Sequence, residues 1–87
     1  MSFKAYVVTK TAYEDIKKLD SATKKKLKDR LEFLLILDDP LSWAVKLPDP
    51  RQGTYRWTIG DYRVIFDVHK RKVIILRVQH RGEIYKS

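Results

Sequence analysis

Hydrophobic positions in the first quarter of the chain predict a strand followed by a helix. Residues 3–9 are rich in β-branched and aromatic side chains, which is typical of a strand. Thr11 and Glu14 then have the spacing of a capping box, so we expect a helix that opens there and runs to about Leu19. Helical spacing places Ala12 and Ile16 with Leu19 on the buried face of this helix.

A second helix is expected over about residues 22–37, capped by Asp20 or Ser21. Its apolar stripe has helical spacing and is formed by Leu27, Leu31, Leu34 and Leu35. Phe33 and Ile36 fall outside that stripe. They either pack against the first helix or form a partly exposed apolar strip for a protein partner.

The second half of the chain has the two-residue period of β-strands. Residues 40–53 contain three prolines and a glycine and cannot be helical throughout. Strands are then expected over about 54–59, 62–68 and 73–79, with a polar, basic loop at 69–72 before the last one. The order is β-α-α-β-β-β. It predicts an α+β fold in one domain, residues 1–87, with two helices packed on one face of a mostly antiparallel sheet.

Gly60 and Asp61 form a two-residue turn that fixes the register of the first hairpin, because glycine accepts the positive φ that such turns need. Thr58 then lies opposite Arg63, and Arg56 lies opposite Ile65. Alternation gives one apolar face, formed by Tyr55, Trp57, Ile59, Tyr62, Val64, Phe66 and Val68. The other face receives Arg56 and Arg63 as diagonal neighbours, about 7–8 Å apart at the backbone.

The last strand is expected to add more cations to this second face. If Ile74, Leu76 and Val78 form its core set, Arg77 and Gln79 lie beside the other arginines, which requires an odd loop or a bulge after Val68. Asp67 is the one acid expected there. Like charges this close destabilise a sheet unless an anion binds, and arginine's planar fork suits phosphate. Solvated arginines on an open face are the alternative.

Composition favours a polyanion partner. The 87 residues carry a net charge of +8, with 44% hydrophobic and 34% charged residues. Such an excess attracts nucleic acid, a ribosome, an anionic membrane or an acidic protein, although it also serves solubility. There is no cysteine, and no carboxylates or histidines have metal-ligand spacing, so neither a metal nor a cofactor is expected. The longest apolar run is too short to span a bilayer, and no signal peptide is recognised, so a cytoplasmic location is expected.

Two segments carry a family resemblance. The hairpin "YRWTIGDYRVIFDV" and the ending "RVQHRGEIYKS" resemble the RelE/ParE toxin superfamily of type II toxin–antitoxin systems, and within it the RelE-type mRNA interferases. The shared patterns are Tyr-Arg-x-x-x-Gly-Asp-Tyr-Arg-Val-Ile and a closing His-Arg-x-x-x-Tyr. The resemblance implies a RelE-like fold and a ribosome-dependent endoribonuclease that cleaves mRNA in the decoding site without a metal and so inhibits translation.

The resemblance also implies the site. Arg56, Arg63 and Arg81 match basic positions around the scissile phosphate, and Tyr85 matches the C-terminal tyrosine, with a docking or a catalytic role. Thr58 departs from the pattern, because some members carry a lysine there. Histidine is the residue type whose ordinary pKa suits acid–base work near neutrality, so His80 is a candidate, but it is also expected to face the core as a structural histidine. The expected RNA-binding residues are Arg77 and the helical lysines Lys24, Lys25, Lys26 and Lys28, which otherwise form a solvated face.

The implied partners are the ribosome with its mRNA and a cognate antitoxin, acidic and helical or extended, through which DNA is contacted only indirectly. No membrane partner is expected. Two other functions stay open. One is a ParE-type toxin that inhibits DNA gyrase by binding. The other is a catalytically weak relative that binds RNA or protein.

Overall fold

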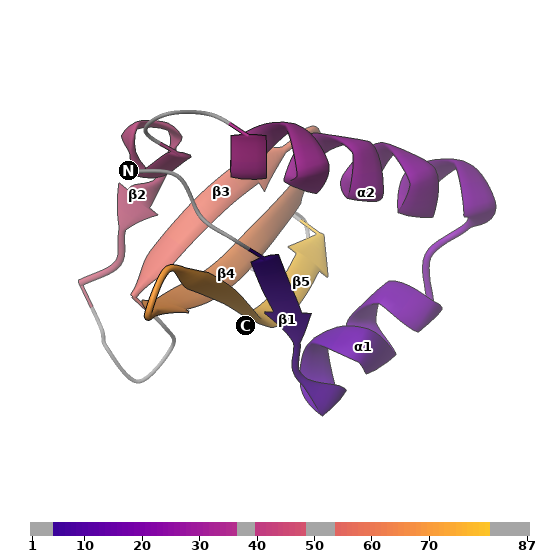
Figure 1. The fold of residues 1–87 in the computed structure, drawn as a ribbon. Coiled ribbons are helices and arrows are strands. Elements are labelled where there is room, and N and C mark those ends of the chain that lie inside the picture. The colour runs from indigo at the N-terminus through magenta and orange to yellow at the C-terminus, as the bar shows by residue number, and fades with distance from the viewer. Residues whose placement is uncertain (1–4, 37–39, 49–53, 81–87) are drawn as a thin grey trace.

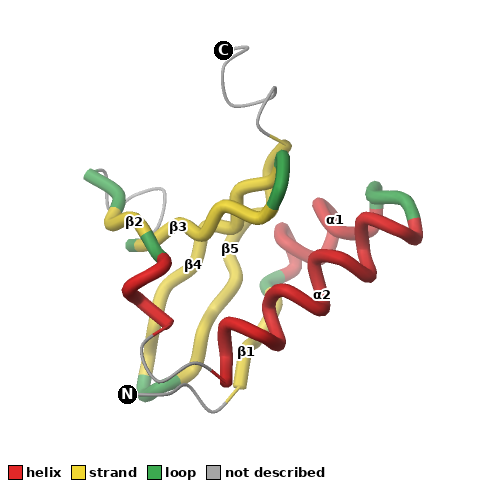
Figure 2. Tube along the Cα trace, turned by 90° about the horizontal axis from the view of Figure 1, so that it is seen from above, coloured by secondary structure: helices red, strands yellow, loops and turns green. Residues whose placement is uncertain are grey.

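The computed structural model describes residues 5–36, 40–48 and 54–80, and in these residues two helices cover one face of a five-stranded sheet. Figures 1 and 2 show both helices on the same side of the strands. The elements are β1 (Ala5–Val8), α1 (Lys10–Lys17), α2 (Ser21–Ile36), the 3₁₀ helix η1 (Pro40–Trp43), β2 (Val45–Lys46), β3 (Tyr55–Ile59), β4 (Tyr62–His69) and β5 (Lys72–His80).

The strand order in the sheet is β1-β5-β4-β3-β2. β1 runs parallel to β5, and the three other pairings are antiparallel. The predicted α+β fold is therefore confirmed, with two short elements, η1 and β2, added inside the proline-rich loop. No helix among the described residues is long and apolar enough to cross a membrane.

The first helix begins earlier than its capping box predicted. Its N-cap is Thr9, whose Oγ1 accepts a hydrogen bond from the Ala12 amide at 3.2 Å. The same hydroxyl donates to the Leu76 carbonyl at 3.3 Å, so it also ties the helix to β5. The expected cap at Thr11 with Glu14 is thus wrong. The predicted N-cap of the second helix is confirmed at Asp20, because its Oδ1 accepts a hydrogen bond from the Thr23 amide at 2.7 Å.

The hairpin of β3 and β4 has the predicted register. Thr58 pairs with Arg63, and Arg56 pairs with Ile65. Gly60 has a φ of +59°, the left-handed conformation that glycine tolerates without strain. A Cβ at this position would also stand 3.0 Å from the Lys26 Nζ, so the glycine leaves room for the side chain that α2 lays over the turn.

The pairing of β4 with β5 differs from the prediction. Lys70 and Arg71 form a two-residue turn, so Val68 pairs with Val73, and a bulge between the Ile65 and Phe66 pairings leaves Leu76 as the extra residue. The core set of β5 is therefore Val73, Ile75 and Val78, and the predicted set with Ile74 and Leu76 is wrong. Because of the bulge, Arg77 still lies on the sheet face predicted for it, where it pairs with Ile65.

The core lies between the sheet and the helices. Trp57 and Phe66 stack with ring centroids 3.9 Å apart, and both are almost fully buried. The helices contribute Ala12, Leu27, Leu31 and Leu34 to the same cluster, which confirms both predicted stripes. Phe33 and Ile36 stay 43% and 77% exposed, which favours the exposed apolar strip over packing against the first helix, and a partner for this strip stays a prediction.

Candidate functional site

The sheet face turned away from the helices carries two rows of side chains that include the predicted arginines. In one row, Ile65 pairs with Arg56 on one side and Arg77 on the other. In the next row, Arg63 pairs with Thr58 and Gln79. Ile65 is only 7% exposed yet lies outside the main core cluster, as expected for an apolar residue between two long arginine stems. We refer to the residues of these two rows as the outward face.

Arg56 has a buried nitrogen without a hydrogen-bond partner among the described residues. Its Nε is inaccessible to solvent, although the side chain as a whole is half-buried. A buried donor of a charged group costs free energy unless something accepts from it, so such atoms mark sites where a ligand binds or where strain is stored. Arg63, the diagonal neighbour of Arg56, is also half-buried.

Arg77 is held by an acid that the sequence did not single out. Its Nε and Nη2 donate to the two carboxylate oxygens of Asp15 at 2.8 and 3.2 Å. The Asp15 Oδ2 also accepts from the Val78 amide at 2.9 Å. Beyond Val8, β1 no longer pairs with β5, so α1 supplies the acceptor for this part of the strand edge. The expectation that Asp67 is the sole acid near the arginines is wrong. Asp67 instead accepts from the Thr54 amide.

Asp15 could have been found in the sequence. It follows Ala12 by three residues and precedes Leu19 by four, which places it on the inward side of a helix. A carboxylate there needs a partner, and its side chain is only 12% exposed. Arg77 is thus held by Asp15 within the protein.

His80 lies apart from these arginines. It pairs with Tyr62, whose side chain belongs to the core face, so the register directs the two side chains to the helix side of the sheet. The rings meet edge to face with centroids 5.1 Å apart. The predicted side of the sheet is therefore correct for His80, although the residue is exposed there. With Lys18 and Arg77 it lines an open hollow of about 270 Å³ beside the end of α1. The pairing does not bring His80 together with Arg56 and Arg63.

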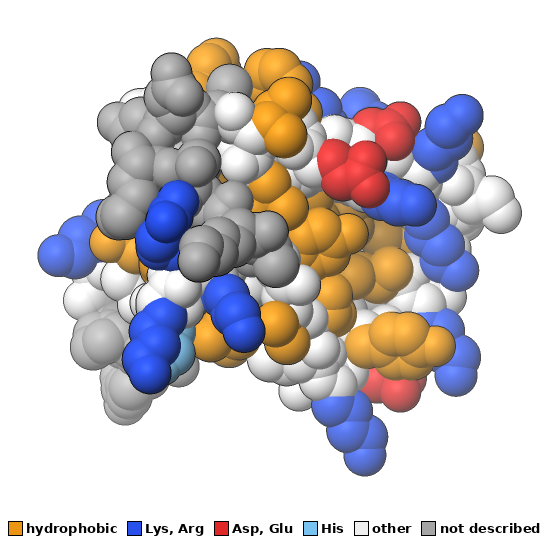
Figure 3. Space-filling view, viewed as in Figure 1, with side chains coloured by type: hydrophobic (Ala, Val, Ile, Leu, Met, Phe, Trp, Pro, Cys, Tyr) orange, Lys and Arg blue, Asp and Glu red, His pale blue; other side chains and the backbone are white. Residues whose placement is uncertain are grey.

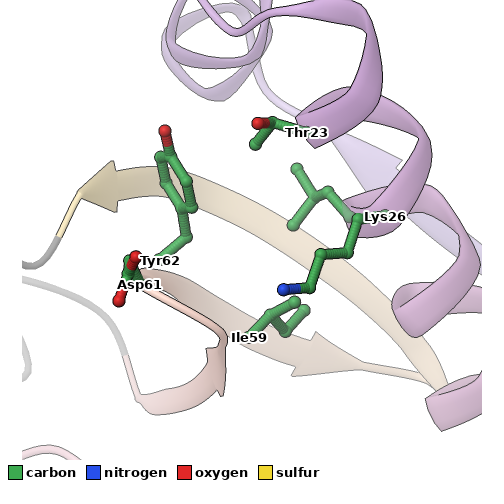
Figure 4. Close-up of a pocket in the computed structure, with 6 residues that line it drawn as sticks. Thr23, Lys26, Ile59, Asp61 and Tyr62 are labelled. Atoms are coloured by element: carbon green, nitrogen blue, oxygen red, sulfur yellow. The ribbon is translucent and has the colours of Figure 1, made fainter.

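The four predicted RNA-binding lysines are all exposed on α2 but do not all lie on one side of it. A rotation of 100° per residue places Lys24, Lys25 and Lys28 within about 100° of one another and directs Lys26 elsewhere. Lys26 extends toward Ile59 over a hollow of about 130 Å³, with Asp61 and Tyr62 on its far side (Figure 4). The prediction that this helix backs the sheet away from the outward face agrees with the fold, and the RNA contacts stay a prediction.

Arg81 and Tyr85 lie outside the described residues. β5 ends at His80, directly before Arg81. Within the described residues, no group of three His, Asp or Glu side chains is placed to hold a metal ion.

The family model for the ParE toxin of type II toxin–antitoxin systems matches residues 6–85 of this chain. No curated protein matches the sequence significantly. Among solved structures, a chain of the toxin–antitoxin complex RelBE2 from Mycobacterium tuberculosis is 30% identical, with a TM-score of 0.67 over 88% of this chain and 96% of that one.

Two archaeal structures have the same fold. A chain of the RelE–RelB complex from Pyrococcus horikoshii is 24% identical, with a TM-score of 0.69 and coverage of 94% of this chain and 98% of that one. A chain of the RelB–RelE antitoxin–toxin complex from Methanococcus jannaschii is 27% identical, with a TM-score of 0.66 and coverage of 91% and 94%. The family model spans nearly the whole sequence, and the mycobacterial structure agrees with it in both sequence and fold. The chain therefore belongs to the ParE toxin family of type II toxin–antitoxin systems, within the RelE/ParE superfamily.

Proposed function

We propose that this toxin is a ribosome-dependent mRNA endonuclease that cuts in the decoding site and so inhibits translation in the cytoplasm. The observation that supports it best is the outward face, where Arg56 and Arg63 are diagonal neighbours and both carry half-buried guanidinium side chains. A phosphodiester supplies anionic oxygens for such donors, and the planar guanidinium matches their geometry.

The reaction needs no group that the chain lacks. The RNA's own 2′-oxygen attacks the adjacent phosphorus, its proton passes to a base, and the bond to the 5′-oxygen breaks as that oxygen takes up a proton. The products are a 2′,3′-cyclic phosphate and a 5′-hydroxyl. Arg56, Arg63 and Arg81 stabilise the extra negative charge on the phosphorus centre, which is worth about 3 kcal/mol for a well-placed donor. Tyr85 orients a nucleotide by stacking or assists the proton transfer.

His80 is a candidate for the base that takes the 2′-hydroxyl proton, but the fold does not favour it. Its pairing with Tyr62 directs it toward the helix side of the sheet, whereas Arg63 lies on the outward face. Its place at the very end of β5 keeps it within a residue of Arg81, so the assignment remains testable. His80→Gln should lower cleavage less than Arg63→Ala does.

The proposed partners are the ribosome with its mRNA and a cognate antitoxin. The solved relatives are toxin–antitoxin complexes, which supports an antitoxin for this chain. With a net charge of +8, the toxin favours an acidic wrapping segment. The exposed Phe33 and Ile36, with the Arg30 guanidinium 5.5 Å from the centre of the Phe33 ring, offer apolar anchors for it.

Primer extension on translated mRNA tests the proposal. The wild-type toxin should produce cuts with 2′,3′-cyclic phosphate ends that depend on translation, and Arg63→Ala should abolish them while the fold survives. Arg30→Ala removes one guanidinium from the opposite side of the molecule and serves as the matched control. Cleavage by Arg63→Ala at the wild-type rate would show that the outward face is not the site.

Inhibition of DNA gyrase is the second candidate, because the matching family model is that of ParE toxins. It predicts no mRNA cleavage and a loss of gyrase supercoiling activity in the presence of the purified toxin. Both assays applied to one preparation therefore separate the two functions.

A further inference from the structure

The turn between β4 and β5 has a backbone that its residues do not favour. Lys70 has a φ of +50° and Arg71 a φ of +66°, so both central residues of a two-residue hairpin turn are left-handed. Such turns favour Asn-Gly, Asp-Gly or Gly-Gly, because other side chains are strained there. The other hairpin of the same sheet places a glycine at its turn, Gly60. The backbone preference of the turn therefore does not explain the Lys-Arg pair.

The same turn concentrates positive charge. His69, Lys70, Arg71 and Lys72 are consecutive and all exposed, and we call residues 69–72 the basic turn. Figure 3 shows lysine and arginine side chains gathered beside a histidine where Figure 1 places the end of the β4–β5 hairpin. Asp67, the nearest acid in sequence, accepts a hydrogen bond from the Thr54 amide.

The basic turn lies away from the proposed site. β4 runs from the Gly60–Asp61 turn at one end to the basic turn at the other, and Figure 2 places the two turns at opposite ends of the sheet. Lys70 follows Arg63 by seven positions, which at about 3.3 Å per position corresponds to about 23 Å. A phosphate bound at one location cannot reach the other, so the two contact different parts of a nucleic acid.

We propose that the basic turn is a docking element that binds the phosphate backbone of ribosomal RNA, remote from the scissile phosphate. The inference rests on the proposed function for the identity of the RNA. A hairpin tip two residues wide projects its cations in several directions, which suits insertion between phosphate backbones. The strained backbone is tolerated because the cations at the tip contribute binding.

A protein partner fits this tip less well. The apolar residues next to it, Val68 and Val73, pair with each other on the core face. The four exposed residues therefore offer charge without an apolar anchor, whereas protein interfaces depend on buried apolar or aromatic anchors. Contacts made by charge alone give the steep salt dependence of phosphate binding.

The test replaces the pair by the sequence that the turn favours. Lys70→Asn with Arg71→Gly removes two charges and relieves the backbone, so it should raise the Tm by a few degrees or more. The same variant should bind purified ribosomes more weakly. The slope of log affinity against log salt should fall by about 1–2, as expected for two lost phosphate contacts. Lys10→Gln with Lys17→Gln removes the same charge from exposed positions on α1 and is the matched control.

Opposite changes in Tm and in ribosome affinity, absent from the control, support the proposal. Unchanged ribosome binding overturns it, and so does equal weakening by the control, which would assign the effect to net charge. A lower Tm in the Asn-Gly variant also overturns it, because the Lys-Arg pair would then have a structural role. Weakened binding of the antitoxin alone would place a protein at the tip instead. Ribosome binding is measured without cleavage, so failure of the endonuclease proposal is read separately.

Discussion

Removal of the Asp15 carboxylate should show how far α1 fixes the end of β5. In Asp15→Ala, the Val78 amide loses its acceptor and Arg77 loses both of its hydrogen bonds. A hydrogen bond to a charged acceptor contributes about 1.5–3 kcal/mol. The Arg77 side chain is 42% exposed, so screening limits its pairing with Asp15 to about 1 kcal/mol. Alanine favours the helix by about 0.5 kcal/mol over aspartate, which offsets part of the loss.

The expected cost is therefore about 2–3 kcal/mol of unfolding free energy, or a fall in Tm of about 10 °C or more for a domain of this size. Asp15→Asn keeps one oxygen for the Val78 amide and should cost less than Asp15→Ala. Arg77→Ala leaves the Val78 hydrogen bond in place, so it should cost about 1 kcal/mol. Urea unfolding followed by the fluorescence of the buried Trp57 measures all three variants.

The double variant provides the decisive comparison. Asp15→Ala combined with Arg77→Ala should cost about 1 kcal/mol less than the sum of the two single changes, because the ion pair can be lost only once. Additive costs would mean that the ion pair contributes nothing. A cost of less than about 0.5 kcal/mol for Asp15→Ala would equal that of an ordinary surface change and refute the role of the carboxylate at the strand edge.

Three further predictions concern the helices. Replacement of all four α2 lysines by Gln should raise the ribosome concentration needed for half-maximal cleavage and flatten the salt dependence of that concentration. The cleavage rate at saturating ribosome should stay unchanged, and a lower rate would show that the helix shapes the site. The lysines are Lys24, Lys25, Lys26 and Lys28. Phe33→Ser with Ile36→Ser should weaken antitoxin binding in a titration, and unchanged affinity would move the interface elsewhere. Hydrogen bonds from the Thr23 side chain and amide lower the pKa of Asp20. Its contribution to stability should therefore be present above the ordinary aspartate pKa and be lost as the pH falls through the lowered value. In Asp20→Asn the acid-side loss in an unfolding titration should be smaller.

The register of the first hairpin could be predicted because two signals agreed. Gly60 and Asp61 fixed the turn length, and alternation from Trp57 to Val64 gave a single core face. Neither signal exists for β5. Lys70 and Arg71 lack the composition of a two-residue turn, and Val73 to Leu76 are four consecutive apolar residues with no alternation. Which residues of β5 face the core depends on the length of the turn and on the bulge. The local sequence does not clearly encode either of them.

The first helix shows the same limit at its cap. Thr11 with Glu14 fitted the capping pattern better than Thr9 did. Thr9 is nevertheless the cap, because its hydroxyl both accepts from the Ala12 amide and donates to the Leu76 carbonyl. The second contact spans 67 residues of sequence. A contact of that range depends on the position of β5 and cannot be read from the residues around the helix start.

The arginines of the outward face are held in different ways, and this difference predicts different effects of their removal. Arg77 is neutralised within the protein by Asp15, so its removal should act first on stability. Arg56 keeps a buried donor without a partner among the described residues, so its removal should cost only the packing of its stem on Ile65 and less stability than the removal of Arg77. If both arginines served only the fold, both substitutions would destabilise it. A stable Arg56→Ala variant that no longer cleaves mRNA would instead assign Arg56 to the anion that the face is built to hold.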